Sequence, residues 1–252
     1  MGCGHRIAIA AGKGGVGKST VAVHLAQALE RLGGCIGILD ADLYGPSLGK
    51  MLPQEEGLHL EEGGLIPAKG LGVHYVSLSQ FAWGKKATLV RAPIANQIMG
   101  DFLQEVRWPS LDFLLIDFPP GTGDIHLTIL QKMSLSGAIL VTTPQEVALL
   151  DVAKAHEMFL AMGVPILGVV ENMSFFQESE TSVKLFPFGR GHVERFCLEK
   201  GLKRLIELPL DAEISHCCDK GLALGVENSS RRLFDKLAQD IQQVLMEVKA
   251  GG

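Results

Sequence analysis

The chain has 252 residues, which at roughly 100 to 200 residues per domain allows one large domain or two small ones. Its 28 acidic residues outnumber its 23 Lys and Arg residues and give a net charge of −5, so we expect no nucleic-acid partner, which would need a clustered basic surface. Hydrophobic residues at 47% and charged residues at 20% exclude a disordered chain. With 30 glycines and only 6% aromatic residues, the composition favours an α/β protein over a β-sandwich.

The sequence shows no membrane or secretion signal. No apolar run approaches the ~18 residues of a transmembrane helix. Residues 1–6 lack the apolar stretch of a signal peptide, and Arg6 stands where a myristoylation motif needs Ser or Thr. Five cysteines are too few, and odd in number, for a disulfide framework; they are Cys3, Cys35, Cys197, Cys217 and Cys218. We therefore expect a cytoplasmic protein without a stable membrane anchor.

Short apolar runs alternate with helical stretches along the chain. In chain order, we expect strands at 6–11, 35–39, 73–78, 112–116, 137–142, 165–170 and 204–208, and helices at 17–32, 193–200 and 231–249. Strands separated by helices pair in parallel, and continuously apolar strands fit a sheet covered on both faces. The chain shows no linker or internal repeat. The prediction is one α/β domain over residues 1–252, a mostly parallel twisted sheet with helices on both faces and ligands at the carboxyl ends of its strands.

A glycine-rich segment between the first strand and the first helix matches the phosphate-loop pattern G-x-x-x-x-G-K-[ST]. It comprises Gly12, Lys13, Gly14, Gly15, Val16, Gly17, Lys18, Ser19 and Thr20. Glycines let backbone N–H groups curl around phosphate oxygens, and the helix N-terminus adds its positive end. Lys18 is expected to reach the β- and γ-phosphates, and the Ser19 hydroxyl to ligate Mg²⁺. The sequence thus predicts a P-loop nucleotide site.

Carboxylates follow two of the predicted strands. Asp40 and Asp42 come after the second strand, where they can hold Mg²⁺ through water or orient an attacking water. Asp117 ends the 112–116 strand, the place of a metal-binding aspartate, and leads into the loop 119–124, whose amides could sense a γ-phosphate. The alternative for an aspartate after a strand, Asp124 above all, is a helix cap or turn former.

Several segments together resemble the Mrp family of P-loop ATPases, within the MinD/ParA and nitrogenase iron-protein superfamily. They are the phosphate loop with its second lysine, DADLYGPS at 40–47, DFPPGTGD at 117–124, TPQE at 143–146, ENMS at 171–174 and LPLD at 208–211. The DADxYGPS and ENMS strings look specific to the Mrp family. The resemblance covers most of the chain and implies a deviant Walker A P-loop fold.

The resemblance also implies roles for particular residues. Lys13 would reach across a homodimer to the partner's nucleotide, although a loop lysine can also simply face solvent. Asp42 would orient the hydrolytic water, and Asn172 with Pro209, Leu210 and Asp211 would face the adenine base. The implied activity is slow hydrolysis of Mg-ATP. The implied function is carrying or assembling iron–sulfur clusters for client proteins.

The chain departs from the family where many members place a C-x-x-C after ENMS. Residues 175–181 read FFQESET, with no cysteine to supply the thiolates that a 4Fe–4S cluster requires. Adjacent cysteines rarely converge on one metal within a subunit, but Cys217 and Cys218 could pair across a dimer axis. The alternative is that they are small apolar core residues. Cluster binding therefore stays open.

The competing function is a positioning ATPase of the MinD/ParA type, which would act on a membrane or nucleoid. Its membrane-bound form would need a basic amphipathic helix at the C-terminus. The predicted helix 231–249 has one apolar stripe but mixed charges on its polar side. We expect this helix to pack on its own sheet instead.

Overall fold

The computed structural model describes residues 3–43, 45–62, 64–77, 80, 92–178 and 181–250. Its strands are β1 (Cys3–Ala10), β2 (Ile36–Asp40), β3 (His59–Glu61), β4 (Gly64–Ile66), β5 (Ala68–Gly70), β6 (Val73–Ser77), β7 (Leu111–Asp117), β8 (Gly137–Thr142), β9 (Ile166–Phe175) and β10 (Arg204–Pro209). Its helices are α1 (Lys18–Arg31), α2 (Leu48–Met51), α3 (Ala92–Glu105), α4 (Asp124–Lys132), α5 (Glu146–Ala161), α6 (His192–Lys200), α7 (Ala212–Lys220) and α8 (Ser229–Ala250). Leu78 and Tyr44, which the sequence analysis placed in a strand and a motif, lie outside these residues.

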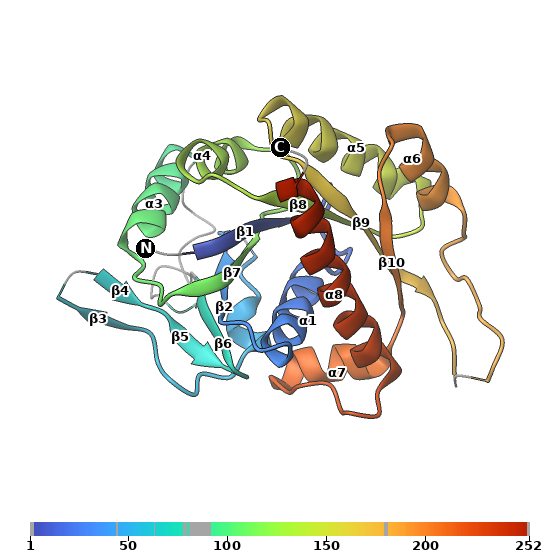
Figure 1. The fold of residues 1–252 in the computed structure, drawn as a ribbon, viewed down its shortest axis with the longest axis horizontal. Coiled ribbons are helices and arrows are strands. Elements are labelled where there is room, and N and C mark those ends of the chain that lie inside the picture. The colour runs from blue at the N-terminus through green and yellow to red at the C-terminus, as the bar shows by residue number, and fades with distance from the viewer. Residues whose placement is uncertain are drawn as a thin grey trace.

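One sheet runs through the described chain in the order β10-β9-β8-β1-β7-β2-β6-β5. Its pairs are parallel except β5 with β6, and β3 and β4 form a separate antiparallel hairpin. Helices α3, α4, α5 and α6 cover one face, and α1, α2, α7 and α8 cover the other (Figure 1). The predicted fold class, a mostly parallel sheet with helices on both faces, is confirmed.

Each face of the sheet has its own apolar core. Along β1, Ile7 and Ile9 pack toward α1 and α8, while Ala8 and Ala10 pack toward α4 and α5. Successive side chains of a strand point to opposite faces, so a central strand that is buried on both faces must be apolar at every position. This is why the strands read as continuous apolar runs in the sequence.

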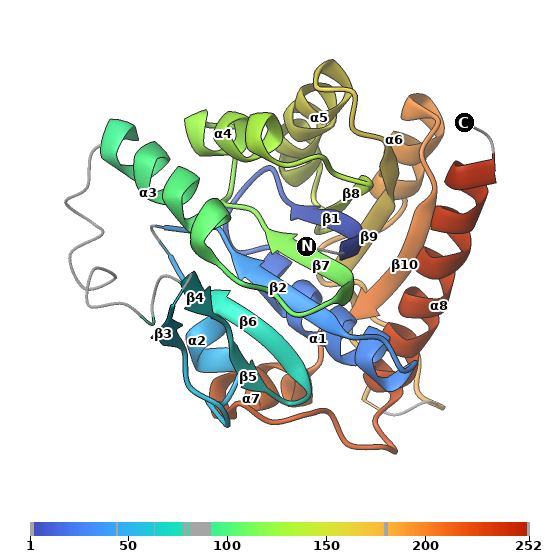
Figure 2. The same cartoon turned by 60° about the vertical axis from the view of Figure 1, so that its left-hand side comes forward.

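The C-terminal helix α8 packs on its own domain. Its stripe residues Phe234, Leu237, Ile241 and Leu245 are buried against α1 and the sheet. At its surface, Asp235 accepts hydrogen bonds from the guanidinium of Arg31 on α1, at 2.5 and 2.9 Å. Figure 2 shows α8 lying along the outside of β10 and α1. The stripe is therefore internal packing. Within the described ranges, no helix is long and apolar enough to cross a membrane.

Candidate nucleotide-binding site

The phosphate loop and two of the predicted carboxylates meet at the carboxyl edge of three neighbouring strands. β7 lies between β1 and β2, and its last residue, Asp117, is in register with Ile9 on one side and with Asp40 on the other. The loop between β1 and α1 leaves the sheet at the same edge. Parallel pairing thus brings together residues that are up to about a hundred positions apart in the sequence.

The loop forms an open cradle at the start of α1. Gly14 and Gly15 are exposed, and a Cβ atom added to either would meet no atom within 4 Å. Helix α1 begins after Gly17 without a side-chain cap, and its first turn carries no acidic residue. The first N–H groups of a helix need acceptors, and they favour an anion. The cradle and the uncapped helix end fit a phosphate group.

Asn172, in β9, holds the phosphate loop through a hydrogen bond. Its side-chain Nδ2 donates a 2.8 Å hydrogen bond to the carbonyl of Val16, and only 6% of the residue is exposed. Gly17 has φ of 83°, and a Cβ atom at this position would overlap the Asn172 amide. The resemblance assigned Asn172 to the adenine base. That contact stays a prediction, whereas the hydrogen bond to the loop was not predicted from any sequence pattern.

Lys18 lies in the middle of the site. Its ammonium pairs with Asp117 Oδ1 and lies 3.3 Å from the Ser19 hydroxyl. Lys18 is 7% exposed and Asp117 is fully buried. The second oxygen of Asp117, Oδ2, is buried and has no hydrogen-bond partner in the described part of the chain. A buried carboxylate oxygen without a partner is costly, so a cation at this oxygen would stabilise the site.

Asp40 is the second buried carboxylate. It accepts hydrogen bonds from the Ser77 hydroxyl at 2.8 Å and from the amides of Asp42 and Leu48 at 3.1 and 3.3 Å. Burial, and then the nearby charge of Asp117, raise the pKa of Asp40 to about 7. Burial also raises the pKa of Asp117, against the lowering effect of Lys18. Two desolvated carboxylates that disfavour each other's charge are a suitable place for a divalent cation.

These donors fit Mg²⁺. Asp40, Asp117 and the Ser19 hydroxyl supply hard oxygen ligands, and Mg²⁺ is usually held by one or two carboxylates together with water and substrate phosphates. No group of three or more His, Cys, Asp or Glu side chains in the described ranges is arranged to hold a metal ion by itself. The fit is therefore to a metal that arrives with a phosphate ligand.

Two loops beside the cradle carry the remaining predicted residues. Asp42 is half-buried and accepts a 3.0 Å hydrogen bond from the Gly45 amide. The loop after Asp117 is hydrogen-bonded to the residue before the phosphate loop, because the Gly121 amide donates to the Ala11 carbonyl at 3.2 Å. Lys13 is half-buried at the start of the cradle, and Asp124 opens α4 as its first residue, after the cap position.

The other predicted adenine-side residues lie at the end of β10 and in the turn that follows it. Asp211 caps α7 by accepting from the Glu213 amide at 2.8 Å, and it also accepts from the Ser230 hydroxyl at 2.6 Å. Leu210 is 40% exposed, and its amide donates to the Phe175 carbonyl at the end of β9. Pro209 is the last residue of β10. The turn is thus a rigid, partly apolar surface at the same edge of the sheet, and its contact with adenine stays a prediction.

The cysteine pair lies in the core between α7 and its neighbours. Cys217 and Cys218 are 4% and 7% exposed. Cys217 Sγ lies 3.6 Å from the Ala223 carbonyl, and Cys218 Sγ lies 3.5 Å from His24 Nε2. Burial raises the pKa of both thiols. This environment favours neutral thiols over the thiolates that iron requires. Of the cysteine-free run after β9, residues 179 and 180 lie outside the described residues.

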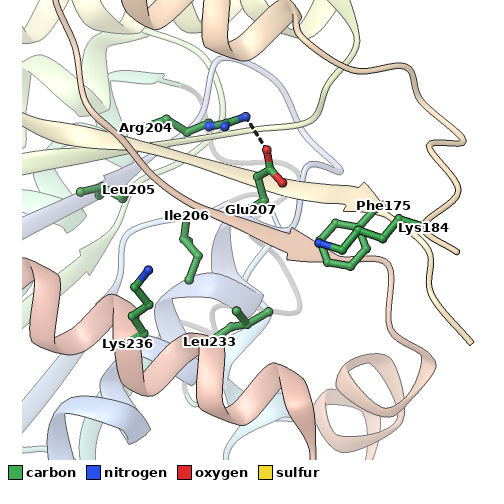
Figure 3. A pocket seen from close by; sticks show the side chains of 8 residues that line it. All are labelled: Phe175, Lys184, Arg204, Leu205, Ile206, Glu207, Leu233 and Lys236. Atoms are coloured by element: carbon green, nitrogen blue, oxygen red, sulfur yellow. Dashed lines mark ion pairs between the residues drawn. The ribbon is translucent and has the colours of Figure 1, made fainter. Parts of the chain in front are cut away.

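A separate groove of about 340 Å³ lies along the edge strand β10 (Figure 3). Leu233 and Lys236 of α8 line one side, and the Lys184 ammonium lies 3.7 Å from the centre of the Phe175 ring at the other. Arg204 pairs with Glu207 and, at 3.1 Å, with Glu171. None of the lining residues belongs to the phosphate loop.

Comparisons with known proteins find similar sequences and structures. A family model described as NUBPL iron-transfer P-loop NTPase matches residues 2–246. The iron–sulfur cluster carrier protein of Aquifex aeolicus is 40% identical over 96% of this chain and 68% of its own length, and that of Pyrococcus horikoshii is 38% identical over 98% and 89%. The chain spans about two thirds of the length of several bacterial relatives, 62% for the Deinococcus radiodurans protein.

Two solved structures show the same architecture. The nucleotide-binding protein of Archaeoglobus fulgidus, solved in complex with ADP, superposes with a TM-score of 0.79 at 34% identity and covers 92% of both chains. The cell division ATPase MinD of Pyrococcus furiosus superposes with a TM-score of 0.69 at 22% identity, over 96% of this chain and 99% of its own. At that identity, MinD shows a shared fold alone.

Proposed function

The chain belongs to the NUBPL iron-transfer P-loop NTPase family, and from this we propose that it binds Mg-ATP, hydrolyses it slowly as a homodimer, and carries or assembles iron–sulfur clusters. One observation carries the ATPase part of the proposal. The uncapped phosphate cradle opens beside the buried Lys18, Asp117 and Asp40 side chains. The Archaeoglobus fulgidus relative was solved with ADP, which supports an adenine nucleotide. We place the protein in the cytoplasm, because five cysteines are too few, and odd in number, for the disulfide framework of a secreted protein.

On nucleotide binding, the Lys18 ammonium would exchange the Asp117 carboxylate for a phosphate group. The ammonium now pairs with Asp117. A β- or γ-phosphate would compete for the same ammonium, and its arrival would release the Asp117 carboxylate. Ser19, Asp40 and Asp117 would then hold Mg²⁺, directly or through water, and the metal would neutralise phosphate charge. Asp42, at the rim of the site, would orient the attacking water.

The homodimer part of the proposal depends on Lys13. This second lysine stands at the entrance of the cradle and is half-buried. In the deviant Walker A arrangement that the sequence resembles, this lysine contacts the nucleotide of the partner subunit. A charge-assisted hydrogen bond to a phosphate would then form only in the dimer, which would make turnover depend on dimerisation.

The cluster is a cargo in this proposal. Several relatives carry the name iron–sulfur cluster carrier protein, and one from rice is a chloroplast Fe–S cluster assembly factor. In this chain Cys217 and Cys218 are the candidate ligands, and both would have to leave the core as thiolates to bind iron. A partner protein that supplies ligands is the other source. Client or scaffold proteins are therefore part of the proposal.

The membrane- or nucleoid-positioning alternative has less support. The apolar stripe of α8, which would have to face a membrane, packs on α1 and the sheet. Co-sedimentation with liposomes and with DNA, each with ATP, should therefore leave the protein in the supernatant.

The test of the proposed function compares three proteins in one ATPase assay. Wild type should hydrolyse Mg-ATP slowly, Lys18→Ala should lose activity, and Lys203→Ala, which removes an exposed lysine at the start of β10, should match wild type. Anaerobic reconstitution with iron and sulfide, followed by iron analysis and transfer to an apo-protein, tests the carrier role. Equal ATP hydrolysis by wild type and Lys18→Ala would reject the site.

A further inference from the structure

His126, in the first turn of α4, contacts the loop that follows Asp117. Its Nε2 lies 3.0 Å from the Pro119 carbonyl, and its ring lies 5.4 Å from the Phe118 ring, centre to centre. The residue is 1% exposed, and both Phe118 and Pro119 are buried. The ring is therefore held in one place against the start of the loop.

The chemistry of this contact fixes the state of the imidazole. A carbonyl oxygen only accepts hydrogen bonds, so Nε2 must carry the proton and donate it to Pro119. Burial lowers the pKa of His126, against the smaller raising effects of the Pro119 and Gly123 carbonyls, and this favours the neutral ring. Nδ1 is then an acceptor, and within the described ranges it has no partner. The single N–H group is fully committed to the loop.

The loop itself has a second attachment that nucleotide binding would break. The Gly121 amide donates to the Ala11 carbonyl, at the start of the phosphate loop. For this amide to reach a γ-phosphate in the cradle, it must leave Ala11. A cavity of about 280 Å³ lies beside the loop, lined by Asp42, Asn96 and residues 119–126 except 121 and 122. The loop therefore has space in which to rearrange.

We propose that His126 is a positioning residue of the ATPase site, whose Nε2–H group anchors Pro119 while Gly121 exchanges Ala11 for the nucleotide. The inference rests on the proposed ATPase function. A fixed start at Pro119 limits the positions that the glycines can adopt when the loop re-pairs. Without the anchor, the loop would reach the catalytic arrangement less often, although the cradle that binds ADP would stay intact. The expected effect is on kcat rather than on nucleotide affinity.

The test uses substitutions that differ in where they place a donor. His126→Gln can put an amide nitrogen near the position of Nε2, whereas His126→Asn is too short and His126→Leu has no donor. His156→Leu is the matched control, because His156 is also buried, at 6% exposed, but lies on α5 outside the nucleotide site. Each variant is measured for ADP affinity and for kcat and KM with Mg-ATP. Amide hydrogen exchange of Phe118 and of residues 121–123, the loop positions that carry an N–H group, is followed with ADP and with a non-hydrolysable ATP analogue.

We expect kcat of His126→Leu and His126→Asn to fall about tenfold, equivalent to ~1.4 kcal/mol, because a buried carbonyl loses its donor. ADP affinity should stay within about twofold, and His126→Gln should recover most of the rate. In wild type the ATP analogue should change amide exchange in the loop, and in His126→Leu the loop should exchange rapidly with either nucleotide. His156→Leu should behave as wild type in all these measurements.

Three outcomes would overturn the proposal. They are an unchanged kcat in His126→Leu, an ADP affinity that falls in proportion to kcat, and a His126→Gln protein as slow as His126→Asn. If His126→Leu does not fold, the comparison of the Gln and Asn variants decides. If wild type shows no Lys18-dependent hydrolysis, the proposed ATPase function fails, and the hydrogen-exchange comparison still accepts or rejects the anchor separately.

Discussion

Gly17→Ala is the substitution whose effect can be worked out most fully from the structure. Gly17 has φ of 83°, a left-handed conformation that costs a residue with a side chain about 1–2 kcal/mol. Its new Cβ atom would also overlap the Asn172 amide, which must then move away from the Val16 carbonyl. Leaving a buried polar group without its partner costs about 1–3 kcal/mol. We expect the free energy of unfolding to fall by about 2–5 kcal/mol.

Gly33→Ala is the matched control for the backbone cost. Gly33 follows α1 with φ of 90°, and a Cβ atom there would meet nothing within 4 Å. It should therefore cost only the strain, about 1–2 kcal/mol. Urea unfolding of the two variants separates strain from overlap. ADP titration should show weaker binding for Gly17→Ala and unchanged binding for Gly33→Ala.

A double-mutant cycle with Asn172→Ala tests the cause directly. Once the Asn172 side chain is removed, Gly17→Ala has nothing to overlap and should add only the strain. The two substitutions should therefore cost less together than the sum of the single changes, by about 1–3 kcal/mol. If Gly17→Ala is no more destabilising than Gly33→Ala, or if the two changes are additive, the bracing role of Asn172 is refuted.

Three further predictions concern charge and metal. Lys13→Ala should reduce ATP turnover and ATP-linked dimerisation, because Lys13 would contact the nucleotide of the partner subunit, while ADP binding to the monomer persists. If the turnover per subunit of wild type does not change with protein concentration, a role of Lys13 in trans is contradicted. The pKa of Asp40 is raised to about 7, so its stabilising protonation is complete below the unfolded value near 4 and is lost as pH rises through 7. Without Mg²⁺, the free energy of unfolding from urea titrations should therefore fall between about pH 4 and pH 7, less steeply in Asp40→Asn, and an equal slope in both proteins would reject this assignment. After anaerobic reconstitution and desalting without a partner protein that could supply ligands, wild type and the Cys217→Ser, Cys218→Ser double variant should both retain little iron, because burial raises the pKa of both thiols. A stable cluster found only in wild type would instead identify the pair as ligands.

The strand β9 shows where sequence patterns stop being informative. The apolar run predicts a strand at 165–170, because Glu171 and Asn172 interrupt it. The observed strand continues to Phe175. Glu171 is buried and pairs with Arg204 at 3.1 Å and with the Ser174 hydroxyl at 3.0 Å, and Asn172 bonds to the phosphate loop. Polar residues can continue a buried strand when distant segments supply their partners, and such partners are not visible in a local pattern.

Local sequence patterns also do not reveal the environment of the cysteine pair or of His126. The sequence left open whether Cys217 and Cys218 are ligands or core residues, because adjacent cysteines have no diagnostic spacing. Packing of α7 buries both in the core, Cys218 beside His24 and Cys217 beside the Ala223 carbonyl. No motif in the sequence marks His126 as a site residue. Only the folded loop brings its ring against the Pro119 carbonyl.

Local sequence patterns are sufficient to predict the phosphate loop, the parallel α/β class and the strands that end at Asp40 and Asp117. These features depend on local chemistry, namely a glycine-rich turn before a helix and apolar runs buried on two faces. Which groups share the site depends on how the strands pair in the folded sheet. Register between β2 and β7 places Asp40 beside Asp117, and β9 brings Asn172 beneath Gly17. Such contacts join segments far apart in the chain, and their energies depend on burial and distance, which exist only after the sheet has formed.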